Sequence, residues 1–139
     1  MRPMIQALES RCLFSATPSQ AVLDAMAQVA ADKAQIQTDL AAFHAGIVAA
    51  NAAFATAKAT ALASIKDALG DSPFGGLIGG IVNSALGTAR QALHDAVSIH
   101  NAALKANVAA WKVTHATDVA TLHTDIAALH SAIKASHVH

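Results

Sequence analysis

The sequence has few residues of the kinds that form cross-links or bind nucleic acid. It holds one cysteine and no tyrosine, and a single cysteine cannot form an internal disulfide. This excludes the disulfide-stapled scaffolds of small secreted domains. Nine basic and nine acidic residues give a net charge of zero, so the basic surface that binds phosphates is missing. We therefore expect no nucleic-acid partner.

Motifs of catalysis are missing as well. The sequence has no glycine-rich phosphate loop, no G-x-S-x-G elbow and no H-E-x-x-H motif. It also shows no pair of acidic residues in an apolar setting. Trp111 lies on an apolar helical stripe, where tryptophan belongs to a core more often than to a ligand site. The sequence thus indicates no enzyme, no cofactor and no small-molecule substrate.

Alanine dominates what is present. The 139 residues suit one compact domain, and 54% of them are hydrophobic. Alanine accounts for 36 residues, about half of that hydrophobic fraction. Because alanine is the smallest apolar side chain, the expected core is thin.

The first sixteen residues differ in composition from the rest and hold Glu9, the one glutamate of the chain. Glu9 and Arg11 interrupt the apolar run that a secretory signal peptide needs. Leu8, Glu9, Arg11 and Leu13, followed by Ser15 and Ala16, resemble the LEPR-XLL sorting segment of exported and surface proteins of planctomycete bacteria. In this chain Ser10 replaces the usual proline and Phe14 a leucine. The resemblance implies a leader over residues 1–16 and sorting to the cell envelope or exterior, and it covers only that segment.

Helix signals dominate the domain expected over 17–139. Thr17, Pro18 and Gln20 form a capping box with proline at the first helical position, and Gly70 supplies a stop. We expect helices over 18–69, 73–86 and 89–136, the second ending at Gly87. Two long helices joined by a glycine-rich corner predict an all-α fold, a long antiparallel helical hairpin that resembles a coiled coil.

Apolar residues recur along both long helices at heptad spacing, with a four-residue stutter near Lys58 and one break between His115 and Val119. Off-stripe apolar residues widen this face, and a lone alanine-rich hairpin buries little area, so we expect a homo-oligomer. The off-stripe residues are Leu23, Val48, Leu62, Ile99 and Val113. The expected self-association stripe comprises Ile36, Leu40, Phe43, Ile47, Phe54, Leu104, Trp111, Leu122, Ile126 and Leu129.

The glycine-rich corner between the long helices is free of charge from residue 74 to residue 87. Small residues at four-residue intervals favour a tightly packed end cap. The alternative is a tip that docks on or inserts into a membrane, which is not the favoured interpretation. At fourteen residues the corner is too short to span a bilayer. Its candidate residues are Phe74, Gly75, Gly76, Leu77, Ile78, Gly79, Gly80, Ile81 and Val82.

Histidines gather in the C-terminal half. His115 and Asp118 have the spacing of helical metal ligands, and His137 with His139 could chelate a metal weakly, but neither pair makes a site by itself. A metal or small-ligand binder is therefore the second alternative to a structural role. His100 and His115 fall on the apolar stripe. Because burial disfavours the charged imidazolium, we expect acid to loosen the bundle.

Overall fold

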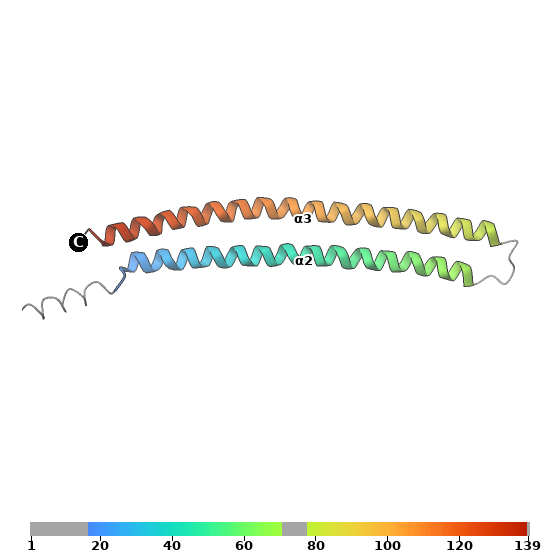
Figure 1. The fold of residues 1–139 in the computed structure, drawn as a ribbon, viewed down its shortest axis with the longest axis horizontal. Helices are drawn as coiled ribbons and strands as arrows, with labels where there is room; N and C mark the ends of the chain where they lie inside the picture. Colours follow the sequence, from blue (N-terminus) through green and yellow to red (C-terminus); the bar gives the residue numbers. More distant parts are fainter. Residues whose placement is uncertain (1–16, 71–77, 139) are drawn as a thin grey trace, which may run out of the picture. The chain divides into compact units, whose positions relative to one another are not determined.

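The chain forms two helices over the residues described by a computed structural model, 17–70 and 78–138 (Figure 1). Helix α2 spans Gln20–Gly70 and helix α3 spans Ile78–Ser136. The described part contains no strand. The all-α helical hairpin expected from the sequence is confirmed. The leader segment and part of the glycine-rich corner lie outside the described residues.

Helix α2 begins two residues later than the sequence predicts. The backbone carbonyl of Ser19 accepts hydrogen bonds from the amides of Val22 and Leu23, at 2.9 and 3.1 Å. The Gln20 side chain does not turn back to the cap; its Nε2 donates to Asp24 Oδ1 at 2.7 Å. This contact is a pair four residues apart on the helix surface, which stabilises the first turn.

The single domain expected from residue 17 divides into two compact units. Unit 1 joins the start of α2, up to Thr38, to the end of α3, from Thr114. Unit 2, Asp39–Val113, contains the rest of both helices and the connection between them. In each unit a segment of α2 packs against a segment of α3.

The interior of both units is small. Among the described residues the buried hydrophobic side chains are mostly alanines, and no large side chain is fully buried. Buried hydrophobic residues are Val22 and Val29 in unit 1 and Ala61, Ala89 and Ala96 in unit 2. The expectation of a thin core holds. Since burial stabilises by roughly 25 cal/mol per Å² of apolar area, each helix contributes little to its partner per turn.

The spacing of the residues that are not exposed differs between the units. In unit 1 they are 22, 25, 29, 32 and 36 on α2, at alternating steps of three and four, and 115, 118, 119, 122, 125, 126, 129 and 132 on α3, which contain the same heptad rhythm. In unit 2 they are 39, 40, 43, 46, 47, 50, 54, 57, 61, 65 and 68 on α2, where 40 to 61 contains heptad steps before a four-residue step to 65. On α3 they are 85, 86, 89, 93, 96, 100, 104, 107 and 111, where steps of three, four and four form an eleven-residue repeat. Heptads favour a left-handed supercoil and eleven-residue repeats a right-handed one.

The heptad prediction therefore fails on the unit 2 part of α3, whereas on α2 the predicted positions Leu40, Phe43, Ile47, Ala50 and Phe54 are all half-buried. Small residues, Gly46, Ala57, Ala61 and Ala96, also occupy the seam. Some large apolar residues that continue the predicted spacing are exposed: Met26, Leu69, Val97, Val108 and Ile133. A four-residue step places small residues where the helices approach most closely, and the larger neighbours turn outward.

The corner also differs from the prediction. The helix expected over 73–86 is not separate, since α3 runs from Ile78 through Gly87 and Thr88 without interruption. Gly87 has no left-handed backbone conformation, which a glycine that ends a helix usually adopts. An interior glycine weakens a helix by about 1 kcal/mol, less than the hydrogen bonds that a break would forfeit. The helix therefore continues.

Helix α2 is long and apolar enough to cross a membrane, judged by length and composition alone. It contains an 18-residue window with a mean hydropathy of 1.5, none of which is buried inside the structure. The same criteria are met by core helices of soluble proteins and by signal sequences. Length and composition alone do not distinguish a membrane-spanning helix from these two kinds of helix.

Candidate functional site

Polar and aromatic side chains lock the two helices of unit 2 in one register. Asn107 Nδ2, on α3, donates to the backbone carbonyl of Phe43, on α2, at 2.9 Å. Four residues further along α3, the Trp111 ring stacks on the Phe43 ring with centroids 5.0 Å apart. Both side chains lie at positions of the eleven-residue repeat. The bond and the stack together fix which turn of α3 faces which turn of α2.

Gly46 makes this arrangement possible. A Cβ atom placed on Gly46 would lie 2.7 Å from both Nδ2 and Oδ1 of Asn107. Real Cβ contacts are longer than this, so only glycine leaves space for the Asn107 amide. Sequence reasoning missed the pair, although a glycine and an asparagine within otherwise apolar stripes were visible signals.

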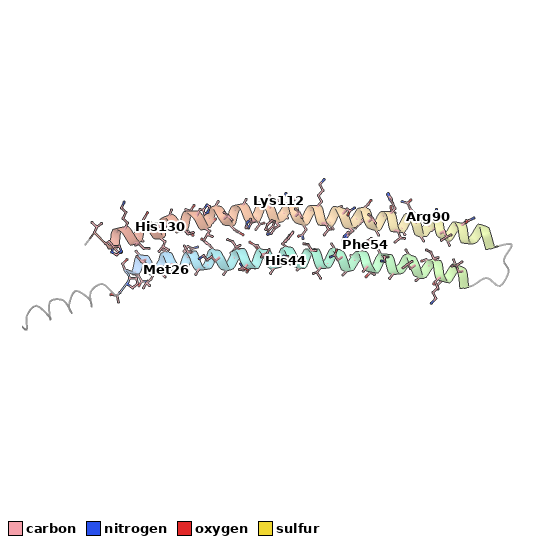
Figure 2. The ribbon with its side chains drawn as sticks, in the orientation of Figure 1. Met26, His44, Phe54, Arg90, Lys112 and His130 are labelled. Atoms are coloured by element: carbon pink, nitrogen blue, oxygen red, sulfur yellow. The ribbon has the colours of Figure 1, made fainter. Side chains whose placement is uncertain are left out.

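A second lock lies nearer the corner. The Nδ1 atom of His100 is 3.1 Å from the backbone carbonyl of Ala50, and its ring stacks on Phe54 with centroids 5.0 Å apart. Phe54 is labelled on α2 in Figure 2. A carbonyl oxygen only accepts hydrogen bonds, so Nδ1 carries the proton. The predicted stripe position of His100 therefore lies within the seam of the hairpin.

Beside this lock runs an apolar groove with a volume of about 260 Å³. Its lining consists of five alanines together with Phe54, Ile99 and His100. The Ile99 side chain is 69% exposed. The groove is therefore a shallow apolar surface with one large side chain standing at its edge. Its full lining is Ala50, Ala53, Phe54, Ala57, Ala96, Ile99, His100 and Ala103.

Unit 1 places acidic side chains between its helices. Asp32, on α2, is only 9% exposed. It lines a hollow of about 80 Å³ together with Gln35, Asp118 and Thr121. Gln28 Nε2 donates to Asp32 Oδ1 at 3.3 Å. Sequence reasoning did not find this acidic group. The pairing joins residues far apart in the chain, and no local pattern shows it.

The third carboxyl of this cluster belongs to Asp125 of α3. A hydrogen bond with Asp32, together with burial and repulsion by the Asp32 charge, raises the pKa of Asp125 above its usual 3.8. The side chain of Gln28 opposes the shift by hydrogen bonding to the charged form. A carboxyl with a raised pKa holds its proton at higher pH than an exposed aspartate does.

The predicted metal candidates do not assemble a site among the described residues. No group of three or more histidine, cysteine, aspartate or glutamate side chains is placed there to hold an ion. His115 and Asp118 are half-buried and both take part in other interactions. His137 is exposed, and His139 lies outside the described residues. The predicted pH sensitivity of His100 and His115 stays a prediction.

The ten residues of the predicted self-association stripe are all half-buried. All of the off-stripe residues that widen the apolar face are exposed, from 44% for Leu23 to 70% for Val113. The stripe thus contributes to contacts within the hairpin. The outward apolar surface comes from the off-stripe positions.

The predicted corner is described only in part. Phe74, Gly75, Gly76 and Leu77 lie outside the described residues, and Ile78, Gly79, Ile81 and Val82 belong to α3. Gly80 lines an open hollow of about 460 Å³ with Ser64, Ser84, Ala85 and Thr88. Two members of the predicted row of small residues, Gly80 and Ser84, therefore line this hollow.

Several serine and threonine hydroxyls on the exposed faces are hydrogen-bonded within their own helices. Hydroxyls of threonine and serine donate to the backbone carbonyl four residues earlier, as Thr56, Thr60 and Ser64 do in succession at 3.0 Å each. Thr121, Thr124 and Ser131 repeat the contact on α3 at 3.0–3.1 Å. A surface whose donors are already bonded can be covered by another apolar surface with little loss.

Comparisons with known proteins assign no family to this fold. No family model matches the chain, and no curated protein or solved structure shows significant similarity to it.

Proposed function

We propose that the protein is a non-enzymatic, exported structural component, an antiparallel coiled-coil hairpin that self-associates through its outward apolar side chains. The observation that carries this proposal is the mismatch between a small interior and a large apolar exterior. The buried hydrophobic residues of the described part are alanines and two valines, whereas Val48, Ile99 and Val113 are each at least 66% exposed.

A second copy of the chain is the occupant that best fits this surface. Full burial of one valine or isoleucine side chain contributes about 1.5–3 kcal/mol. The groove of unit 2 is lined by alanines and has Ile99 at its edge, so it offers both a hollow and a protruding side chain. In a two-fold dimer each copy presents the same patch, and Ile99 of one copy can fill the groove of the other. The internally bonded hydroxyls lower the penalty of covering the surface.

Light scattering coupled to gel filtration tests the proposal. We expect a mass that is a multiple of 14.1 kDa for the wild-type chain. Ile99→Asp should shift the mass toward the monomer, because it places a charge in the groove. Val138→Asp is the matched control, since Val138 is 76% exposed and lies beyond the end of α3. A wild-type chain that stays monomeric at high concentration would exclude self-association.

Export is proposed from the resemblance of residues 8–16 to a planctomycete sorting segment. The test is fractionation of cells that express the full chain, with Arg11→Ala as the variant. Retention of the variant inside cells that export the wild-type chain would support the assignment. Equal distribution of both would remove it.

Membrane contact is the second candidate, and the apolar window of α2 favours it. The window has a mean hydropathy of 1.5 and is not buried inside the structure, and the serine and threonine hydroxyls bond to their own helix. Membrane helices satisfy such groups in the same way. Co-sedimentation with liposomes tests this candidate. Replacement of Phe74 and Leu77 by serine asks whether the corner is the point of contact, and a chain that stays in the supernatant excludes the candidate.

A further inference from the structure

Asp32 is a buried carboxylate with incomplete hydrogen bonding. Its side chain is 9% exposed, and Oδ1 accepts one hydrogen bond, from Gln28 Nε2 at 3.3 Å. Oδ2 is buried and has no hydrogen-bond partner among the described residues. A buried oxygen that lacks a donor costs about 1–3 kcal/mol, and more when it is charged. The site therefore requires a donor that a fully ionised cluster does not provide.

The groups that face Asp32 are acidic or neutral. From α3, Asp125 comes within hydrogen-bond reach, and Asp118 shares the hollow with Asp32. Gln28 and Gln35 come from α2 and are neutral. Lys33 of α2 and His123 of α3 are exposed, and His115, three residues before Asp118 on α3, is half-buried. No cation contributes to the electrostatics of Asp125, whose charged partner is Asp32.

Two carboxylates this close, in a partly desolvated setting, repel each other strongly when both are ionised. A proton on one of them removes the repulsion and supplies a donor to the other. We propose that Asp32 and Asp125 share one proton, and that this carboxyl pair makes unit 1 a pH-sensitive clasp, with its two helix segments held more tightly in mild acid than at neutral pH. The proton resides on Asp125 and is donated to Asp32 Oδ2.

The direction of the pH effect follows from the raised pKa of Asp125. A group whose pKa is higher in the folded than in the unfolded chain stabilises the fold at pH values below its unfolded pKa. That stabilisation is lost as the pH rises through the folded pKa. Unit 1 should therefore gain stability as the pH falls from neutral toward the usual range of aspartate.

A metal ion is the other group that could neutralise these charges. Hard cations such as calcium take six or more oxygen ligands. The hollow beside Asp32 presents two carboxylates, one amide and one hydroxyl, and no three acidic or histidine side chains of the described part surround a common point. The geometry thus favours a proton over a metal ion as the group that neutralises the charge.

The test compares thermal melts of full-length Asp125→Asn and wild-type protein by circular dichroism, at about pH 7 and about pH 4.5. The asparagine amide donates permanently to Asp32 Oδ2, so the variant should melt several degrees higher than wild type at pH 7. The difference should shrink at pH 4.5, because the raised pKa of Asp125 lets wild type take up the proton as the pH falls toward the usual range of aspartate. Asp67→Asn, at an exposed site of α2 in unit 2, is the matched control and should show no such difference.

Three results would overturn the proposal. The first is an Asp125→Asn variant that melts at or below wild type at pH 7. The second is a rise in the wild-type melting temperature at pH 7 with millimolar calcium or magnesium that a chelator reverses, which would assign the site to a cation. The third comes from carboxyl-carbon NMR of wild type, which does not depend on the variant folding. We expect an Asp125 midpoint above 3.8 that falls in Asp32→Asn, and a midpoint at or below 3.8 contradicts the shared proton.

Discussion

Replacement of Gly46 by alanine tests the register lock of unit 2 directly. At an open helical position, glycine to alanine stabilises a helix by about 1 kcal/mol. At Gly46 the new Cβ would lie 2.7 Å from the Asn107 amide, which must rotate away and give up its 2.9 Å hydrogen bond to the Phe43 carbonyl. Loss of that bond, with a half-buried amide left partnerless, costs about 1–3 kcal/mol. We expect a net change between about zero and 2 kcal/mol of destabilisation.

Gly87→Ala is the matched control. Gly87 is also an interior helical glycine of unit 2, but no atom lies within 4 Å of a Cβ built on it. This variant should gain about 1 kcal/mol. The two glycine variants should therefore differ by about 1–3 kcal/mol, with Gly46→Ala the less stable protein. Urea unfolding followed by circular dichroism measures both, at one protein concentration because self-association adds to apparent stability.

A double-mutant cycle with Asn107→Ala assigns the difference to the contact. Without the Asn107 amide, Gly46→Ala meets no obstacle and should stabilise by about 1 kcal/mol, as Gly87→Ala does. Additive free energies in the cycle would show that Gly46 and Asn107 act independently. Equal stabilisation by Gly46→Ala and Gly87→Ala in the wild-type background would refute the packing argument.

Three further outcomes follow from the seams of the units. Phe54→Ala removes the ring that stacks on His100 and should lower the free energy of unfolding by about 2 kcal/mol, as measured in urea. The loss is smaller than for a fully buried phenylalanine because Phe54 is half-buried. An unchanged urea midpoint would contradict a stabilising stack. Phe43→Ala should shift the fluorescence of Trp111 to longer wavelength as the indole becomes wetter, and an unshifted spectrum would show that Phe43 does not cover it. Thermal melts between about pH 7.5 and 5 test the expectation that protonation of His100 and His115 loosens the bundle. Equal stability of wild type and His100→Gln across that range would show that His100 does not contribute to the effect.

Much of the fold was predictable because helix formation is encoded locally. The alanine content, the stop near Gly70 and the apolar periodicity specify two long helices and a hairpin. The corner was not predictable in the same way. A glycine such as Gly87 ends a helix only when the chain turns there, and in this protein it lies in the middle of α3.

The register and the acidic pair depend on contacts between distant residues, which no local pattern encodes. A seam prediction from sequence follows the large apolar side chains, but in unit 2 the buried positions are Ala61 and Ala96, whereas their larger neighbours Leu62 and Val97 are exposed. Asp32 carries no local signal of its burial, because Asp125, its partner on the facing helix, is far away in sequence.

The pairing of α2 with α3 in unit 2 restricts how the hairpin can change its length. The residue numbers of facing partners add to a constant in the contacts of Phe43 with Asn107 and of Ala50 with His100, since α3 returns along α2. Removal of eleven residues from one helix alone shifts every partner beyond the cut by three turns. Removal of eleven residues from both helices, at facing positions, shortens the hairpin and leaves the remaining contacts between α2 and α3 intact. Insertions and deletions in this region should therefore survive natural selection only as matched pairs.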